Sequence, residues 1–233
     1  FKLTGTLTVS NSTFSGNSAT DDGGAIYIAN GSSTTTVTNS IFSGNSGRRG
    51  AGLFGLGTVT VTNSTFNGNS ATLYGGGLFN QGTTTVTNST FYNNRVTVYR
   101  QSNGGAITIS GGGETRIIHS TFSGNQGKYI YGRGDAIYHV TGAPLLLANN
   151  IVSSNGPNES CYTTSGNVTE VNSLISSGNC GGTLAGDPLL VGLADYGGPA
   201  NTFALGPDSP AIDAAYPAYC PADDQRGQSR PYG

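Results

Sequence analysis

The sequence carries very little charge and lacks both methionine and tryptophan. Asp, Glu, Lys and Arg make up 9% of its 233 residues, against about 25% in typical soluble domains. The formal net charge is −2, so we expect no basic face that could displace counterions from phosphates, and no nucleic-acid partner. The longest apolar run, residues 143–148, is far shorter than the about 18 residues of a membrane-spanning helix, so no membrane span is predicted.

Cysteine and histidine are also scarce, with three and two residues respectively. No CxxC motif and no cluster of histidines accompanies the cysteines, so the sequence predicts neither a metal site nor another cofactor. The chain begins at Phe1 without an initiator methionine or a signal-peptide pattern. This indicates a processed chain or a piece of a longer one.

Repetition is what the sequence does contain. One phrase recurs as SNSTFSGNSA, TNSIFSGNSG, TNSTFNGNSA, TNSTFYNNRV and IHSTFSGNQG. A second phrase follows each copy as GGAIYI, GAGLF, GGGLF, GGAITI and GDAIYHV. Self-similarity of this kind is the sequence signature of a repeat architecture, in which each unit is too small to bury its own core.

The residues between the turns alternate with period two, as in Thr58-Val59-Thr60-Val61-Thr62. This pattern predicts half-buried strands with valine inside and threonine outside. Helical periodicity is absent, and Gly and Asn interrupt the chain every dozen residues or so. The sequence therefore predicts an all-β right-handed parallel β-helix, a solenoid of about seven rungs over residues 1–180, with a C-terminal capping segment over residues 181–233.

In such a coil, equivalent residues of successive rungs stack about 4.8 Å apart. The repeat predicts a buried aromatic stack of Phe14, Phe42, Phe66, Phe91 and Phe122. An aliphatic column is predicted for Ile26, Leu53, Leu78, Ile107 and Ile137. Amide ladders with hydrogen bonds between rungs are predicted for Asn17, Asn45, Asn69, Asn94 and Asn125, and at the corners for Asn11, Asn39, Asn63 and Asn88.

The repeat units resemble those of polymorphic outer membrane protein-like and related bacterial surface β-helices, over residues 5 to about 142. The later phrases DPLL, ADYGGPANTFAL, SPAID and CPADDQRGQSRP resemble the choice-of-anchor Q domain of bacterial surface proteins. This resemblance implies display outside the cell, and it makes Asp187, Asp213, Asp223, Asp224 and Arg226 features of a closing cap. The chain lacks the family's usual continuation and any anchor, so the resemblance implies no mode of attachment.

Two cysteines bracket a loop after the sixth rung. In an oxidising compartment we expect a disulfide between Cys161 and Cys180, and the resemblance points the same way. Two buried thiols are the alternative. Cys220 is left without a predicted partner.

Parallel β-helices often carry polysaccharide lyases and hydrolases, which need clustered carboxylates or a base beside Lys or Arg. No paired-carboxylate motif appears, and Asp21-Asp22 is interpreted as the cap of a solvated turn. The best enzymatic constellation is an insertion with His119 and His139 nearby in sequence, although His119 occupies an Asn-ladder position and is interpreted as structural. The insertion equally suits a glycan-binding surface. Its residues are Lys128, Tyr129, Tyr131 and Arg133.

Three outward columns of hydroxyl side chains begin at Thr6, Thr8 and Ser10. Such an array is typical of an ice-binding surface, but threonine is also an ordinary choice for exposed strands. Glu114, Arg116 and Ile118 interrupt the columns, which counts against ice binding. Asn-x-Ser/Thr triplets at corner positions match glycosylation acceptors, but a glycan there would block stacking, so we interpret them as ladder residues.

Together these features predict an extracellular or cell-surface solenoid with a structural or adhesive role. We expect no catalytic residues. Its predicted partners are other copies, joined head to tail into a fibre, or other surface components such as glycans. A polysaccharide lyase or hydrolase is the main alternative, and an ice-binding protein is the third.

Overall fold

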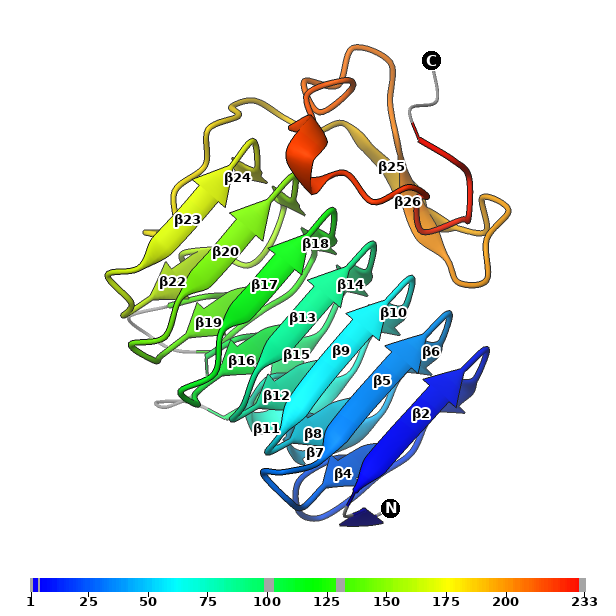
Figure 1. The fold of residues 1–233 in the computed structure, drawn as a ribbon, viewed down its shortest axis with the longest axis vertical. Helices are drawn as coiled ribbons and strands as arrows, with labels where there is room; N and C mark the ends of the chain where they lie inside the picture. The colour runs from blue at the N-terminus through cyan, green and yellow to red at the C-terminus, as the bar shows by residue number, and fades with distance from the viewer. Residues whose placement is uncertain (1, 4, 99–102, 129–132, 231–233) are drawn as a thin grey trace.

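The structure is a computed structural model that describes residues 2–3, 5–98, 103–128 and 133–230. Its main body is a coil in which each rung contributes one short strand to each of three long parallel sheets (Figure 1). Every neighbouring pair of strands in these sheets is parallel, from the pair β2 and β5 to the pair β20 and β23. The predicted parallel β-helix is therefore confirmed.

The strands of the coil fall into three seven-stranded sheets and one short one. Sheet A contains β1 (Lys2–Leu3), β4 (Ile26–Ile28), β8 (Leu53–Gly55), β12 (Leu78–Asn80), β16 (Ile107–Ile109), β19 (Ile137–His139) and β22 (Cys161–Thr163). Sheet B contains β2 (Thr6–Ser10), β5 (Thr34–Thr38), β9 (Thr58–Thr62), β13 (Thr84–Thr87), β17 (Thr115–Ile118), β20 (Leu145–Ala148) and β23 (Val168–Val171). Sheet C contains β3 (Thr13–Ser15), β6 (Ile41–Ser43), β10 (Thr65–Asn67), β14 (Thr90–Tyr92), β18 (Thr121–Ser123), β21 (Ile151–Val152) and β24 (Leu174–Ile175). Three middle rungs add the short sheet of β7 (Ser46–Arg49), β11 (Ser70–Tyr74) and β15 (Arg95–Val96).

The core is narrow and consists of columns that run along the axis. The rings of Phe42 and Phe66 stack with centroids 4.5 Å apart, and Phe91 and Phe122 continue the stack at spacings of 4.8 and 4.9 Å. These four rings are fully buried. Phe14 also stacks, 4.8 Å from Phe42, but as a first-rung residue it is only half-buried. The predicted aliphatic column of sheet A is buried beside the rings.

An inner asparagine ladder fixes the turn after sheet C. Asn45 donates from Nδ2 to Oδ1 of Asn69 at 2.8 Å, and its backbone N–H donates to the same oxygen at 3.0 Å. The Nδ2 of Asn69 also donates to the carbonyl of Phe42. The predicted ladder is present, and it extends by one further residue, Asn155. Its members are Asn17, Asn45, Asn69, Asn94, Asn125 and Asn155. Each buried amide is thus satisfied by its neighbours in the coil.

The corner asparagines between sheets B and C do not form the predicted ladder. Asn11, Asn39, Asn63 and Asn88 have φ between 46° and 50°, a left-handed conformation that asparagine tolerates better than most residues. The Oδ1 atoms of Asn39 and Asn63 are buried without a hydrogen-bond partner. Backbone conformation, and not bonding between rungs, explains asparagine here. His119 takes the same left-handed conformation, at φ 49°.

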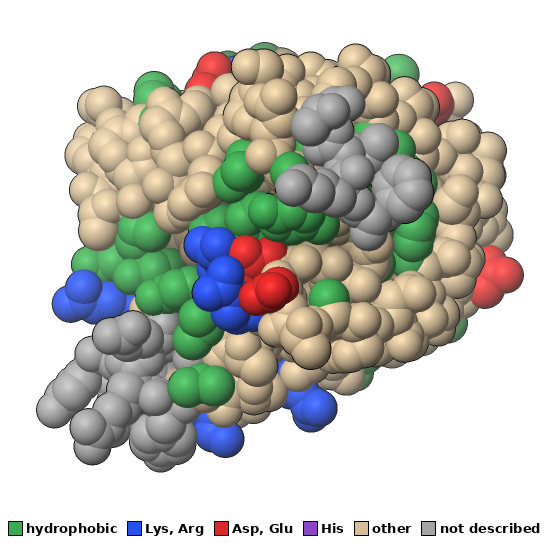
Figure 2. All heavy atoms as spheres, turned by 90° about the horizontal axis from the view of Figure 1, so that it is seen from below, with side chains coloured by type: hydrophobic (Ala, Val, Ile, Leu, Met, Phe, Trp, Pro, Cys, Tyr) green, Lys and Arg blue, Asp and Glu red, His purple; other side chains and the backbone are tan. Residues whose placement is uncertain are grey.

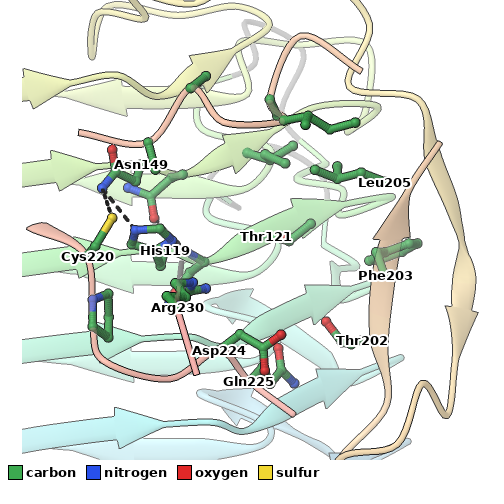
Figure 3. A pocket seen from close by; sticks show the side chains of 18 of the residues that line it. His119, Thr121, Asn149, Thr202, Phe203, Leu205, Cys220, Asp224, Gln225 and Arg230 are labelled. Atoms are coloured by element: carbon green, nitrogen blue, oxygen red, sulfur yellow. Dashed lines mark hydrogen bonds between the residues drawn. The ribbon is translucent and has the colours of Figure 1, made fainter. Parts of the chain in front are cut away.

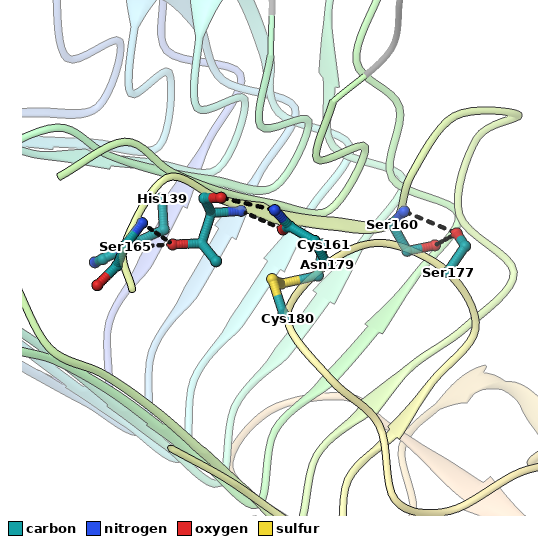
Figure 4. The surroundings of a disulfide bond; sticks show 8 residues. His139, Ser160, Cys161, Ser165, Ser177, Asn179 and Cys180 are labelled. Carbon is teal, nitrogen blue, oxygen red and sulfur yellow. Dashed lines mark hydrogen bonds between the residues drawn. A yellow bond between two sulfur atoms is a disulfide. The ribbon is translucent and has the colours of Figure 1, made fainter. Parts of the chain in front are cut away.

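A disulfide closes the last rung. Cys161 of β22 is joined to Cys180, and both are buried (Figure 4). Asn179 bonds the backbone of Thr163 from both ends of its amide, each at 2.8 Å. Leu184 then bridges to Leu174 of β24. The segment after the last strand therefore lies over the core at this end.

The rest of the C-terminal segment lies along the side of the coil (Figure 1). The sequence had instead predicted a cap over the end. It contains the antiparallel hairpin of β25 (Leu190–Ala194) and β26 (Thr202–Leu205), and a short 3-10 helix, η1 (Pro217–Tyr219). Residues 201–230, which we call the strap, bond to the coil at several rungs. The disulfide loop already covers the end, and the corner amides offer polar partners along the side.

Candidate functional site

A column of aromatic side chains runs along the outer face of sheet A. In each three-residue strand of sheet A the first and third residues point into the core, so the side chain of the second residue points outward. The middle residues of successive strands are Tyr27, Phe54, Phe79, Thr108, Tyr138 and Tyr162. The rings of Tyr27, Phe54 and Phe79 stack at 5.1 Å, and those of Tyr138 and Tyr162 at 5.8 Å. We call these five rings the aromatic column.

One end of the aromatic column is covered by a charged cluster. The Arg49 guanidinium lies 4.9 Å from the Phe54 centroid and 5.0 Å from that of Phe79, within the range of a cation–π interaction. Arg49 also pairs with Asp22 at 2.6 Å, and Arg48 pairs with Asp22 at 3.2 Å. Phe54 and Phe79 are consequently buried although they point outward.

Asp22 is therefore not the solvated turn cap that the sequence suggested. Its side chain is only 6% exposed. Burial by itself raises the pKa of this carboxyl, but the hydrogen bonds and charges of Arg49 and Arg48 outweigh burial, so the pKa lies below its ordinary value. The two arginines that neutralise Asp22 come from the next rung, in β7, which a reading of adjacent residues could not reveal.

The other end of the aromatic column is open. Tyr138 and Tyr162 are half-buried and Arg133 is exposed. The Arg133 guanidinium lies 4.5 Å from the Tyr162 centroid, and its Nη1 donates to the Tyr162 hydroxyl at 2.7 Å. Burial raises the pKa of Tyr138, and the neighbouring phenols of Tyr74 and Tyr162 add to this effect.

The predicted insertion site is only partly assembled at this open end. Arg133 reaches the aromatic column, and Lys128 is exposed at the start of the insertion. Tyr129 and Tyr131 lie outside the described residues. The base of the insertion is held by Asp135, whose buried carboxylate accepts hydrogen bonds from the backbone of Gly127 and from Asn158. Asp135 therefore has a structural role, because its hydrogen bonds fix the base of the insertion.

The two histidines do not join this site. His139 points into the core, where its Nδ1 lies 3.0 Å from Thr163 Oγ1, and burial lowers its pKa to about 4. His119 lies on the corner between sheets B and C, where burial and the charge of Arg230 lower its pKa to about 4. Two neutral side chains on different faces cannot act together on one substrate.

A groove of about 1000 Å³ separates the strap from the coil (Figure 3). Asn149 bonds the backbone of Tyr216 with both ends of its amide, at 2.7 and 3.1 Å. Asn149 Nδ2 lies 4.0 Å from the exposed thiol of Cys220 and 3.0 Å from Nε2 of His119. This groove was not predicted from the sequence, although Asn149 stands in the corner position of the repeat.

The cap residues named from the resemblance do not form one cluster in the structure. Asp224 pairs with Arg226 at 2.6 Å and accepts backbone hydrogen bonds within its own turn. Asp187 bonds the backbone of Leu189, whereas Asp223 accepts from Ser229. In the described part of the chain, no group of three His, Cys, Asp or Glu side chains could hold a metal ion.

The threonine columns stand in register on the outer face of sheet B, with Thr8, Thr36 and Thr60 paired across β2, β5 and β9. Arg116 and Leu146 continue this column in later rungs, so the hydroxyl array covers only the first four rungs. Ice binding through it stays a prediction. Among the described residues, no helix is long and apolar enough to span a membrane.

Comparison with known proteins gives one match. A family model described as a right handed beta helix region matches residues 2–137. No curated protein and no solved structure matches the chain. The family match covers more than half of the 233 residues and agrees with the parallel coil of the structure. The chain therefore belongs to the right-handed β-helix family.

Proposed function

We propose that this chain is an extracellular solenoid with a structural and adhesive role, which contacts carbohydrate through the outer face of sheet A. The observation that carries the proposal is the open end of the aromatic column. There Tyr138 and Tyr162 stack at 5.8 Å and Arg133 lies over Tyr162. Exposed aromatic and arginine side chains at fixed positions are typical of binding surfaces.

The periodicity of the coil favours a polymeric ligand. Each rung presents its middle side chain about 4.8 Å beyond the last. A glycan extended along the axis would therefore meet two adjacent platforms at the open end, Tyr138 and Tyr162. A tyrosine ring offers an apolar face for the C–H groups of a sugar and a hydroxyl for its oxygens.

Extracellular placement rests on two observations. The Cys161–Cys180 disulfide is of a kind that persists in oxidising environments. The repeat phrases also resemble those of bacterial surface β-helices. Together these observations favour display outside the cell, where a rigid solenoid can hold a binding face away from a surface.

Binding without cleavage is favoured over the lyase and hydrolase alternative. The β-helix family includes both enzymes and non-enzymes, so its chemistry depends on the individual side chains. Asp22 is neutralised by two arginines, and the carboxylate of Asp135 is occupied by backbone and amide donors. Neither carboxylate is placed to act as a free acid or base.

A binding panel tests this proposal. The chain is mixed with neutral and acidic polysaccharides, and the bound fraction is compared for wild type, Tyr162→Ala and Tyr216→Ala. Tyr216 is 47% exposed on the strap and serves as the matched control. We expect Tyr162→Ala to weaken binding about tenfold, a typical loss for one stacking residue, and Tyr216→Ala to leave it unchanged. Equal binding by all three, or no binding to any glycan, would contradict the proposal, and release of unsaturated oligosaccharides would favour the lyase alternative.

Self-association is a second part of the proposal. Leu7 and Phe14 of the first rung are half-buried, and apolar side chains are visible on the face at this end of the coil (Figure 2). We propose that a second copy covers them head to tail. Sedimentation over a wide concentration range tests this part, since a chain that stays monomeric throughout would contradict it.

A further inference from the structure

One position of the repeat lies directly beside the aromatic column. It is the residue before the glycine that leads into each strand of sheet A, and we call it the pre-glycine position. Hydrogen bonds and bridges keep it in register, from Gly23 N–H to the Arg49 carbonyl and from Tyr74 to Asn103. Its occupants in successive rungs are Asp22, Arg49, Tyr74, Asn103 and Arg133.

Two of these residues are arginines, and both lie over rings of the aromatic column. Arg49 lies 4.9 and 5.0 Å from the centroids of Phe54 and Phe79. Arg133 lies 4.5 Å from the centroid of Tyr162. The repeat thus builds the same arrangement of arginine over aromatic ring twice.

The two arrangements differ in the preceding rung. Arg49 is preceded by Asp22, whose carboxylate accepts from Nε at 3.0 Å and from Nη2 at 2.6 Å. Arg133 is preceded by Asn103, the neutral counterpart of aspartate, which is 7% exposed and has an unpartnered Oδ1. No carboxylate of the described residues lies within 4.0 Å of the Arg133 guanidinium. Among the residues that the structure describes, the first arginine therefore has a counter-charge and the second has none.

We propose that Arg133 binds the carboxylate of a uronate residue in an acidic glycan. The inference rests on the proposed function, and it names the class of sugar that the open end of the aromatic column selects. The ligand carboxylate takes toward Arg133 the role that Asp22 takes toward Arg49, and the sugar ring packs beside Tyr138 and Tyr162. A guanidinium favours this partner because its fork of N–H donors matches a carboxylate.

Charge on this side of the coil supports an anionic ligand. The chain has a net charge of −2, yet Arg95, Lys128 and Arg133 are exposed on the later connections that lead from sheet C to sheet A. On the first two connections, Asp21 and Asp22 offset the charges of Arg48 and Arg49. Such local segregation of positive charge raises the concentration of an anion near the face.

The experiment compares an oligogalacturonate with its methyl ester, which has the same sugar rings without the charge. We expect wild type to bind the acid at least tenfold more tightly, with an affinity that falls as salt is added. Asn103→Asp places a carboxylate where Asp22 stands in the first arrangement, so it should reduce binding of the acid at least tenfold. Asn167→Asp adds the same charge at an exposed residue near the last rung and should leave binding nearly unchanged. Arg133→Gln provides a second variant that does not alter the buried Asn103.

The possible outcomes distinguish uronate recognition by Arg133 from glycan binding as such. Equal binding of acid and ester, or full binding of the acid by both Asn103→Asp and Arg133→Gln, would overturn the uronate proposal and leave glycan adhesion standing. No binding of either oligomer by wild type, together with an unresponsive polysaccharide panel, would overturn both.

Discussion

Arg49 and Arg133 occupy the same position of the repeat, but the surroundings of the two arginines differ. Arg49 lies over buried phenylalanines and is neutralised by Asp22. Arg133 lies over a half-exposed tyrosine and follows a rung with asparagine in place of aspartate. At one end of the sheet this backbone geometry holds a buried ion pair, and at the other it leaves an arginine exposed beside half-buried tyrosines. The two sites differ in the residue of the preceding rung, aspartate or asparagine, and in the ring beneath the arginine, phenylalanine or tyrosine.

The largest expected difference concerns the rings. Phe54→Ala should lower the free energy of unfolding by about 4 kcal/mol, because Phe54 is buried under Arg49 and its loss leaves a cavity. Tyr162→Ala should cost about 1 kcal/mol, because its ring is partly in solvent already. Urea unfolding of both variants measures this, and equal losses would show that the two ends do not differ in burial as described.

The counter-charge comes next. Asp22→Asn should destabilise the fold by about 3 kcal/mol, because it leaves Arg49 and Arg48 near a buried position without a carboxylate. The reciprocal change, Asn103→Asp, should cost far less, since it brings a carboxylate toward Arg133. Thermal unfolding of the two variants checks the asymmetry. Comparable losses would contradict the view that only Arg49 depends on an internal carboxylate.

His139, which is buried next to Tyr138 in β19, should make the stability of the fold depend on pH. The pKa of His139 falls from 6.5 to about 4 because burial disfavours the charged imidazole. Between these two pH values His139 is therefore protonated in the unfolded chain and neutral in the folded chain. Stability is full above pH 6.5 and decreases between pH 6.5 and about 4, on the order of 2–3 kcal/mol for this group.

Urea unfolding at several pH values, with His139→Gln beside wild type, checks this prediction. The variant should show a flatter profile. His119, whose pKa is also about 4, contributes in the same direction, so His119→Gln serves as the comparison. A wild-type profile that stays level over this range would contradict the burial of both rings.

The smallest expected effect is at Arg133. Arg133→Gln should change the free energy of unfolding by less than about 0.5 kcal/mol, because this exposed cation has no carboxylate partner among the described residues. Its effect should appear in ligand binding. A large stability loss would show that Arg133 is a structural residue like Arg49.

The repeat let the sequence predict much of this fold, since recurring Phe, Val and Asn positions specify a coil whose strands pair in register. Bonds between rungs were harder to predict. Asp22 meets Arg48 and Arg49 across 26 and 27 residues, and adjacency in sequence suggested a solvated turn instead. The corner asparagines were read as hydrogen-bonding residues, although a left-handed backbone alone accounts for Asn39 and Asn63.

The strap was the least predictable part, because it lies outside the repeat and its contacts join residues far apart in sequence, such as Gln225 with Thr65 and Tyr216 with Asn149. The sequence placed residues 181–233 over the end of the coil. The aromatic column could have been predicted, since the residue between the two inward residues of each GGAIYI-like phrase points outward. The contrast between Arg49 and Arg133 depends on the register of Asp22 and Asn103 across rungs, which adjacency in the sequence does not show.

The strap has a mechanical consequence for the coil. A solenoid held only by contacts between neighbouring rungs can unwind one rung at a time from an end under tension. Here the strap is bonded to the last rung through Asn172 and Ala214 at 3.0 Å, and to the third rung through Gln225 and Thr65 at 2.9 Å. A pull on the C-terminal end is therefore shared across several rungs at once. The coil should resist peeling until these lateral bonds break together.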